Sequence, residues 1–202
     1  MHAPTFRAGC LLIAAVCGHA ALAAEPIDVS KLSDSAVTMV ELSKPGSPGK
    51  TFAAGTIINA PMQEVCALLQ NYGAYPGFMP NTESAKVTQG GGQALVDITL
   101  KLPMGKIKKY RLRMEPKVGA DSCVLAWKLV PWSGLKPEET IVDTSGQWQL
   151  TPGAASGKTV VRYRVYTDPG PIPFGLGWIV DSLSKDSIPQ TLDAVRKRAV
   201  QH

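Results

Sequence analysis

The interior of this chain lacks histidine and has little cysteine. Its three histidines are His2, His19 and His202, so two lie near the start and one is the last residue. Two of the four cysteines also lie near the start, which leaves Cys66 and Cys123. A zinc site needs a set of Cys, His or carboxylate ligands, and the Ser-His-Asp and Cys-His mechanisms need a histidine. The composition therefore argues against all three, and no cofactor or metal is expected.

The chain also lacks a strong charge of either sign and a long hydrophobic run. Its net charge is +5, well below the basic density of a nucleic-acid-binding domain, so no nucleic-acid partner is expected. An apolar run at residues 10–22 follows Arg7 and ends in small residues. This run is shorter than the ~20 residues of a membrane-spanning helix and is typical of a secretory signal peptide. We predict that residues 1–23 are removed and that the protein is periplasmic or secreted.

The two remaining cysteines can form one disulfide in an exported protein, because an oxidising compartment permits it. Free cysteine is, however, among the most buried residue types. The simpler interpretation is therefore two small buried residues, with Cys66 on a helix and Cys123 on a strand. The sequence leaves both alternatives open.

The first half of the chain predicts a hairpin and two short helices. Residues 36–42 and 51–58 are rich in apolar and β-branched side chains and flank a turn of proline and glycine, which is typical of a β-hairpin. A short amphipathic helix is expected to begin near Pro61, because proline favours the first helical turn. Residues 71–81 predict a second short helical turn.

From residue 94 onward, apolar and polar residues alternate, which predicts strands with one apolar face. About seven antiparallel strands are expected in all, including those at residues 94–102, 110–114, 123–130, 146–150 and 160–168. Apolar residues then recur at steps of three and four over residues 176–195, which predicts a long C-terminal helix. The expected fold class is α+β.

Several short motifs follow one another in an order that resembles a known superfamily. An Ala-Pro helix start at residues 60–61 leads into a Tyr-Pro-x-Phe-x-Pro-Asn segment at 75–81. A Gly-x-Trp strand at 146–148, Tyr163 and the segment DPGPIP at 168–173 come next. Together these motifs resemble the START-like (SRPBCC) superfamily, in particular its polyketide cyclase/dehydrase/lipid-transport and coenzyme Q-binding branch.

The resemblance implies a helix-grip fold, in which a curved sheet wraps the C-terminal helix around a central cavity. It implies a ligand-binding domain at residues 50–202, preceded by an extension at 24–49 that holds the first strand of the hairpin. The same inward-facing residues would otherwise form a filled core. The residues expected to line the cavity are Val96, Ile98, Leu100, Tyr110, Leu112, Met114, Leu125, Trp127, Trp148, Tyr163, Ile179 and Leu183.

Three further groups of residues are expected around this cavity. Tyr110 and Tyr163 can donate hydrogen bonds to a carbonyl or hydroxyl group of the ligand. The cavity rim, or a membrane contact, is expected at Phe78, Trp132, Ile172 and Phe174. A basic face is either a solvated surface of the sheet or a site of transient contact with an anionic membrane, and it comprises Lys106, Lys108, Lys109, Arg111 and Arg113.

An enzyme would need an acid or base in the cavity wall, but the alternation places Asp97, Glu115 and Lys128 on the opposite strand faces. We therefore expect a protein without catalytic residues. A monomer is expected, but the sequence does not determine the oligomeric state. It is expected to bind a lipid, an isoprenoid quinone or a sterol-like molecule, and to transport or shield it. The alternatives are a cyclase or hydrolase that acts on a hydrophobic substrate, and a protein-interaction module with a filled core.

Overall fold

The computed structural model describes residues 26–90, 93–170 and 177–201. The strands are β1 (Thr38–Glu41), β2 (Lys50–Ile58), β3 (Thr82–Gly90), β4 (Gln93–Lys101), β5 (Ile107–Val118), β6 (Cys123–Val130), β7 (Asp143–Pro152) and β8 (Thr159–Asp168). The α-helices are α1 (Met62–Gln70) and α2 (Gly177–Ala199). The 3-10 helices are η1 (Val29–Lys31), η2 (Tyr72–Gly77), η3 (Pro103–Gly105) and η4 (Pro137–Glu139).

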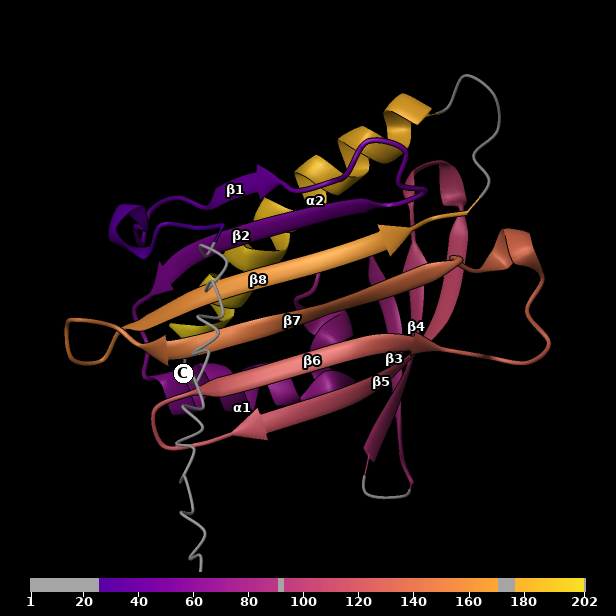
Figure 1. Cartoon of the computed structure of the whole chain (residues 1–202). Helices are drawn as coiled ribbons and strands as arrows, with labels where there is room; N and C mark the ends of the chain where they lie inside the picture. The colour runs from indigo at the N-terminus through magenta and orange to yellow at the C-terminus, as the bar shows by residue number, and fades with distance from the viewer. Residues whose placement is uncertain (1–25, 91–92, 171–176, 202) are drawn as a thin grey trace, which may run out of the picture.

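All eight strands form one antiparallel sheet in the order β1-β2-β8-β7-β6-β5-β4-β3. β3 to β8 are neighbours in sequence order, and β2 pairs with β8 at the far side of this meander. In Figure 1, β3 and β4 are turned steeply away from the direction of β6, β7 and β8, so the sheet is curved. We call the face toward α1 and α2 the inner face and the opposite one the outer face.

The predicted α+β class, the opening hairpin, the two short helices and the long C-terminal helix are confirmed. The sheet has eight strands rather than about seven, because β3 was not predicted from the sequence. The sequence of β3, TESAKVTQG, is largely polar, and β3 pairs only with β4 at the edge of the sheet. An edge strand without an apolar stripe gives no period-two signal.

The core lies on the inner face, where α1 and α2 pack against the sheet and against each other. Both helices pass behind the strands in Figure 1. Val65 and Leu69 of α1 and Leu192 of α2 are completely buried. They meet side chains of the sheet that include Ile58, Leu125, Leu150 and Val161.

A disulfide joins α1 to the sheet. Cys66 lies in the middle of α1 and Cys123 is the first residue of β6, and their Cα atoms lie 6.2 Å apart. The interpretation of two free buried thiols is therefore wrong, although both residues are buried as expected. The bond fixes the middle of α1 against the start of β6 on the inner face of the sheet.

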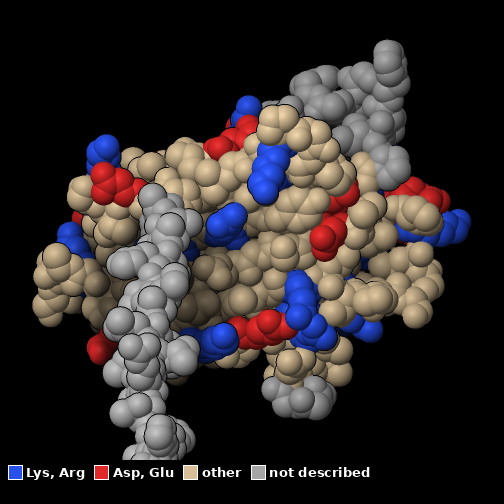
Figure 2. Space-filling model, viewed as in Figure 1, with Lys and Arg blue, Asp and Glu red and all other residues tan. Residues whose placement is uncertain are grey.

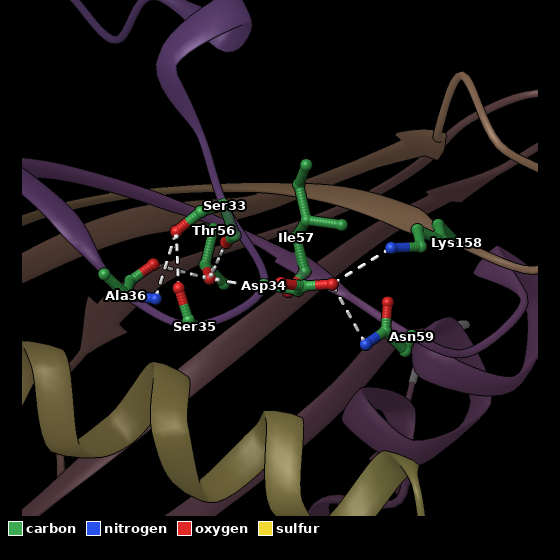
Figure 3. A network of polar contacts seen from close by, with 8 residues as sticks. All are labelled: Ser33, Asp34, Ser35, Ala36, Thr56, Ile57, Asn59 and Lys158. Carbon is green, nitrogen blue, oxygen red and sulfur yellow. Dashed lines mark hydrogen bonds and ion pairs between the residues drawn. The ribbon is translucent and has the colours of Figure 1, made fainter.

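The segment before β1 folds over the outer face and the edge of the sheet. Ile27 and Leu32 pack there on Ala53 and Val160. Figure 3 shows the polar contacts that hold this segment, in which the Asp34 carboxylate accepts hydrogen bonds from Asn59 at 3.2 Å and Lys158 at 2.9 Å. These contacts lower the pKa of Asp34, with Lys158 as the largest cause.

Thr56 provides a second attachment for this segment at the sheet edge. Its Oγ1 lies 3.0 Å from the carbonyl oxygens of both Ser33 and Ala36, which share its single hydroxyl proton (Figure 3). The same oxygen accepts a hydrogen bond from Arg196 of α2. The N-terminal segment, β2 and the C-terminal helix are thus connected through one buried hydroxyl. Within the described residues, no helix is both long and apolar enough to cross a membrane.

Candidate functional site

A cavity of about 540 Å³ lies between the inner face of the sheet, η2 and α2. This volume falls in the usual range of small-molecule sites, about 300–1,000 Å³. The period of two along each strand determines which side chains face it. Thus Val96 and Ile98 of β4 line the cavity, whereas their neighbour Asp97 pairs with Arg111 on the outer face.

The structure brings together most of the residues that the sequence assigned to the cavity. Nine of the expected residues line it, namely Val96, Ile98, Leu100, Tyr110, Leu112, Met114, Trp127, Trp148 and Tyr163. Leu125 is buried in the core and does not line the cavity. It lies two residues before Trp127 on the same face, at the point where α1 and the sheet are already tightly packed. The side chains of Ile179 and Leu183 lie outside the described part of the chain.

Three aromatic rings form the deep wall of the cavity. The ring of Tyr163 stacks on Trp127 with centroids 5.6 Å apart and lies 4.4 Å from the ring of Trp148. Gly146, opposite Trp127 in the register of β6 and β7, leaves room for this indole. The Gly-x-Trp motif therefore supplies one ring of the wall and the space for another.

Burial keeps the tyrosine hydroxyls of the cavity in their neutral form. It raises the pKa of Tyr110 to about 12. It also raises the pKa of Tyr163, with a smaller contribution from Tyr110, and that of Tyr75, with smaller contributions from Tyr72 and Tyr163. The tyrosines Tyr72, Tyr75, Tyr110 and Tyr163 all line the same cavity. Neutral phenols are hydrogen-bond donors near pH 7 rather than proton acceptors.

Tyr72 and Tyr75 were not among the residues expected to line the cavity. They lie on η2, and their rings meet edge to face at 5.8 Å. The hydroxyl of Tyr75 donates to the Leu69 carbonyl at 2.6 Å. The hydroxyl of Tyr72 is buried and has no hydrogen-bond partner within the described residues. The sequence predicted a short helical turn here, but η2 is too short for an amphipathic pattern to show which of its side chains face the cavity.

Polar and charged residues gather at the opposite end of the cavity, which we call the mouth. It lies between η3, the first residues of β5 and η4, and its charged lining residues are Lys50, Lys106, Lys108 and Glu138. Lys106 and Glu138 are exposed, whereas Lys108 is half-buried. Lys108 donates a hydrogen bond to the Thr140 carbonyl at 2.5 Å.

The predicted basic face is divided between two sides of the sheet. Lys106 and Lys108 line the cavity mouth, whereas Lys109, Arg111 and Arg113 lie at the alternate, outward positions of β5. Lys108 lies two, four and six residues before Tyr110, Leu112 and Met114, so its side chain is on the inner face of the sheet with theirs. The prediction of one basic face rested on charge alone, whereas the alternation along β5 separates Lys108 from Lys109, Arg111 and Arg113.

The outer part of this face is mixed in charge rather than basic. Arg111 binds both carboxylate oxygens of Asp97 at 2.5 and 2.8 Å. Oε1 of Glu115 forms ion pairs with Nε of Arg113 at 3.3 Å and with Nζ of Lys128 at 2.8 Å. In Figure 2, basic and acidic side chains accordingly lie next to one another over the outer face.

Of the residues expected at the rim, the structure describes Phe78 and Trp132, and neither lines the cavity. The ring of Trp132 lies 5.2 Å from the guanidinium of Arg111, on the outer side of the sheet. Phe78 packs against Tyr75, with 5.7 Å between the ring centroids, and against the hydrophobic core. Ile172 and Phe174 lie outside the described residues. Among the residues that the structure describes, no group of His, Cys, Asp and Glu is arranged to hold a metal ion.

Comparison with known proteins places this architecture among those of lipid-transfer and cyclase domains. The family model for polyketide cyclase/dehydrase and lipid transport matches residues 58–196. No curated protein matches the sequence.

Solved structures match the fold at low sequence identity. A STAR-related lipid transfer protein from Xanthomonas axonopodis is 19% identical with a TM-score of 0.70, and the match covers 81% of this chain and 93% of that one. The human StAR-related lipid transfer protein 5 is 15% identical with a TM-score of 0.70, over 82% and 83% of the two chains. An aromatase/cyclase from a Streptomyces species is 15% identical with a TM-score of 0.57, over 82% and 94%.

Proposed function

The chain belongs to the polyketide cyclase/dehydrase and lipid transport family, and we propose that its cavity binds a hydrophobic molecule and carries or shields it without changing it. The observation that carries the proposal is the cavity of about 540 Å³ with its wall of aliphatic and aromatic side chains. Burial of apolar ligand surface against such a wall contributes about 25 cal/mol per Å². The candidate ligands are a lipid, an isoprenoid quinone and a sterol-like molecule.

The groups in the wall favour binding over catalysis. A cyclase or hydrolase needs a proton acceptor close to the reacting atoms. Within the described residues, the lining contains one carboxylate, that of Glu138, which is exposed at the mouth. Burial raises the pKa values of the deep tyrosines, so their hydroxyls can orient a ligand but do not act as bases near neutral pH.

We propose that the protein performs this role outside the cytoplasm. The signal-like residues 1–23 support export, and the disulfide between Cys66 and Cys123 is the kind of bond that persists in an oxidising compartment. A carrier in the periplasm would move its ligand through water between membranes. Transient contact of the carrier with a membrane surface stays a prediction.

The test is to identify what the cavity holds. The protein is expressed with residues 1–23 and purified from the periplasm without detergent, then analysed by native mass spectrometry and by organic extraction. We expect one hydrophobic molecule per chain, released unchanged on extraction. A chain that stays empty after exposure to total membrane lipid would contradict the proposal. Release of a chemically altered product after incubation with the extracted molecule would favour the enzyme.

A further inference from the structure

The cavity mouth carries two lysines that form no ion pair with a carboxylate of the described residues. Lys106 follows η3 and Lys108 is the second residue of β5, and both line the cavity. Within the described residues, neither has a carboxylate at ion-pair distance, and the polar contact of the Lys108 ammonium is with the Thr140 carbonyl at 2.5 Å. The third lysine of the mouth, Lys50, is paired with Glu41 at 2.9 Å.

The positive charge of Lys106 acts on the half-buried ammonium group of Lys108. Burial lowers the pKa of Lys108, and the positive charge of Lys106 lowers it further. Glu138 acts in the opposite direction but has a smaller effect than either. An anion placed between the two lysines would relieve this repulsion and replace water lost by the half-buried ammonium. The outer face differs, because Arg111 and Arg113 have carboxylate partners there.

The cavity changes from charged to apolar along β5. The inward residues of this strand run from Lys108 through Tyr110 and Leu112 to Met114, a distance of roughly 20 Å at the usual rise of a strand. Met114 lies opposite Trp127, which stacks on Tyr163. A ligand that matches this gradient has a charged group at one end and a long hydrocarbon part at the other.

We propose that the ligand is an anionic amphiphile, with its acidic head between Lys106 and Lys108 and its hydrocarbon tail along the inner face of β5 toward Trp127. This inference rests on the proposed function and narrows its ligand class. It assigns the two lysines to the cavity rather than to a surface patch. A fatty carboxylate and an alkyl phosphate have the required chemistry in common.

The head group is tested with four probes that share one tail. Binding of dodecanoate, dodecyl phosphate, dodecanol and dodecyltrimethylammonium to the lipid-free full chain is measured below their micelle concentrations, by tryptophan fluorescence and native mass spectrometry. We expect the two anions to bind at least about tenfold more tightly than dodecanol, since a hydrogen bond to a charged group contributes about 1.5–3 kcal/mol. The cation should bind most weakly. The stronger of the two anions identifies the head as carboxylate or phosphate.

Matched variants test the two lysines. In the double variant Lys106→Gln with Lys108→Gln, the advantage of the anions over dodecanol should disappear. The control is Lys109→Gln with Lys117→Gln, which removes the same charge from an outward position and an exposed position of β5. The control should keep the preference for anions.

A charge-reversal variant distinguishes a specific loss of anion binding from a loss caused by misfolding. The double variant Lys106→Glu with Lys108→Glu should prefer dodecyltrimethylammonium to dodecanoate, a gain that a damaged protein would not produce. Equal affinity of the unaltered chain for dodecanol and dodecanoate would overturn the inference and leave the proposed function intact. Binding of anionic vesicles is measured as well. The inference would also be overturned if the glutamine variant lost its binding to anionic vesicles but kept its affinity for dodecanoate. Failure of every probe to bind would count against both proposals.

Discussion

The indole ring of Trp127 lies against Gly146, its partner across the β6–β7 pairing, in the place where a side chain would otherwise stand. A Cβ atom on Gly146 would overlap both this ring and the carbonyl oxygen of Arg164. The glycine therefore allows the ring to sit close to the sheet, and Tyr163 stacks on the ring from the cavity side. The shape of the deep cavity wall depends on the missing side chain.

We predict that Gly146→Ala lowers the free energy of unfolding by about 1–3 kcal/mol, the usual effect of overpacking a tight site. For a chain of this size, each kcal/mol corresponds to roughly 2–4 °C in the melting temperature. Calorimetry measures this shift. The control is Gly119→Ala, where a new Cβ would meet Ser122 at an ordinary 3.7 Å. Equal melting temperatures for the two variants would contradict the role given to Gly146.

The disulfide between Cys66 and Cys123 should contribute strongly to stability. It closes a loop between positions 57 residues apart, for which the chain-entropy treatment gives about 4 kcal/mol. We predict that a reducing agent lowers the denaturant midpoint of the native protein. The double variant Cys66→Ala with Cys123→Ala should unfold at that lower midpoint with or without the reducing agent. A native protein indifferent to reduction would show that the bond does not stabilise the fold.

The sequence predicted those parts of the site that follow from local periodicity. Val96, Ile98, Leu112 and Met114 were assigned to one face, because residues two apart on a strand share a side. The same rule places Lys108 inside, and only its charge led to its assignment to the surface. Here the signal was present in the sequence.

Other parts depended on contacts that the sequence does not display. β3 is a polar edge strand that pairs only with β4, so its structure is imposed by its neighbour. Tyr72 reaches the cavity because η2 packs beside β3, and no repeat within η2 indicates that direction. The pairing of Cys66 with Cys123 likewise requires the packing of α1 on the sheet.

The ionisation of Tyr110 should be delayed in the folded protein. Burial raises its pKa from 10.0 to about 12, so the folded state retains a proton that the unfolded state loses at lower pH. We predict that the free energy of unfolding is unaffected by this group below about pH 10 and falls between about pH 10 and pH 12. Phenolate absorbance should show a late step that Tyr110→Phe removes. A single step near pH 10 for all tyrosines would contradict this burial.

Filling the cavity should reduce ligand binding without unfolding the protein. Val96 lines the cavity and Leu95, its neighbour on β4, lies at an outward position. We predict that Val96→Trp lowers the stoichiometry of bound ligand in native mass spectrometry, at an overpacking cost of about 1–3 kcal/mol. Leu95→Trp adds the same ring outside and should bind normally. Normal binding by a folded Val96→Trp variant would mean that the ligand lies elsewhere.

The two tyrosines of η2 should respond in opposite ways to the loss of their hydroxyls. Tyr72 is only 6% exposed and its hydroxyl has no partner among the described residues, whereas the hydroxyl of Tyr75 donates to Leu69 at 2.6 Å. A buried hydroxyl without a hydrogen bond costs about 1–3 kcal/mol, and a satisfied one stabilises the fold by about 1 kcal/mol.

We therefore predict that Tyr72→Phe raises the melting temperature of the lipid-free protein and that Tyr75→Phe lowers it. With ligand bound, Tyr72→Phe should lower the melting temperature instead. A ligand oxygen that accepts a hydrogen bond from the Tyr72 hydroxyl adds stability that phenylalanine cannot provide. Thermal unfolding with and without the extracted ligand measures both effects. If Tyr72→Phe is stabilising by the same amount in both states, the ligand does not use this hydroxyl, and the polar end of the ligand is held at the mouth alone.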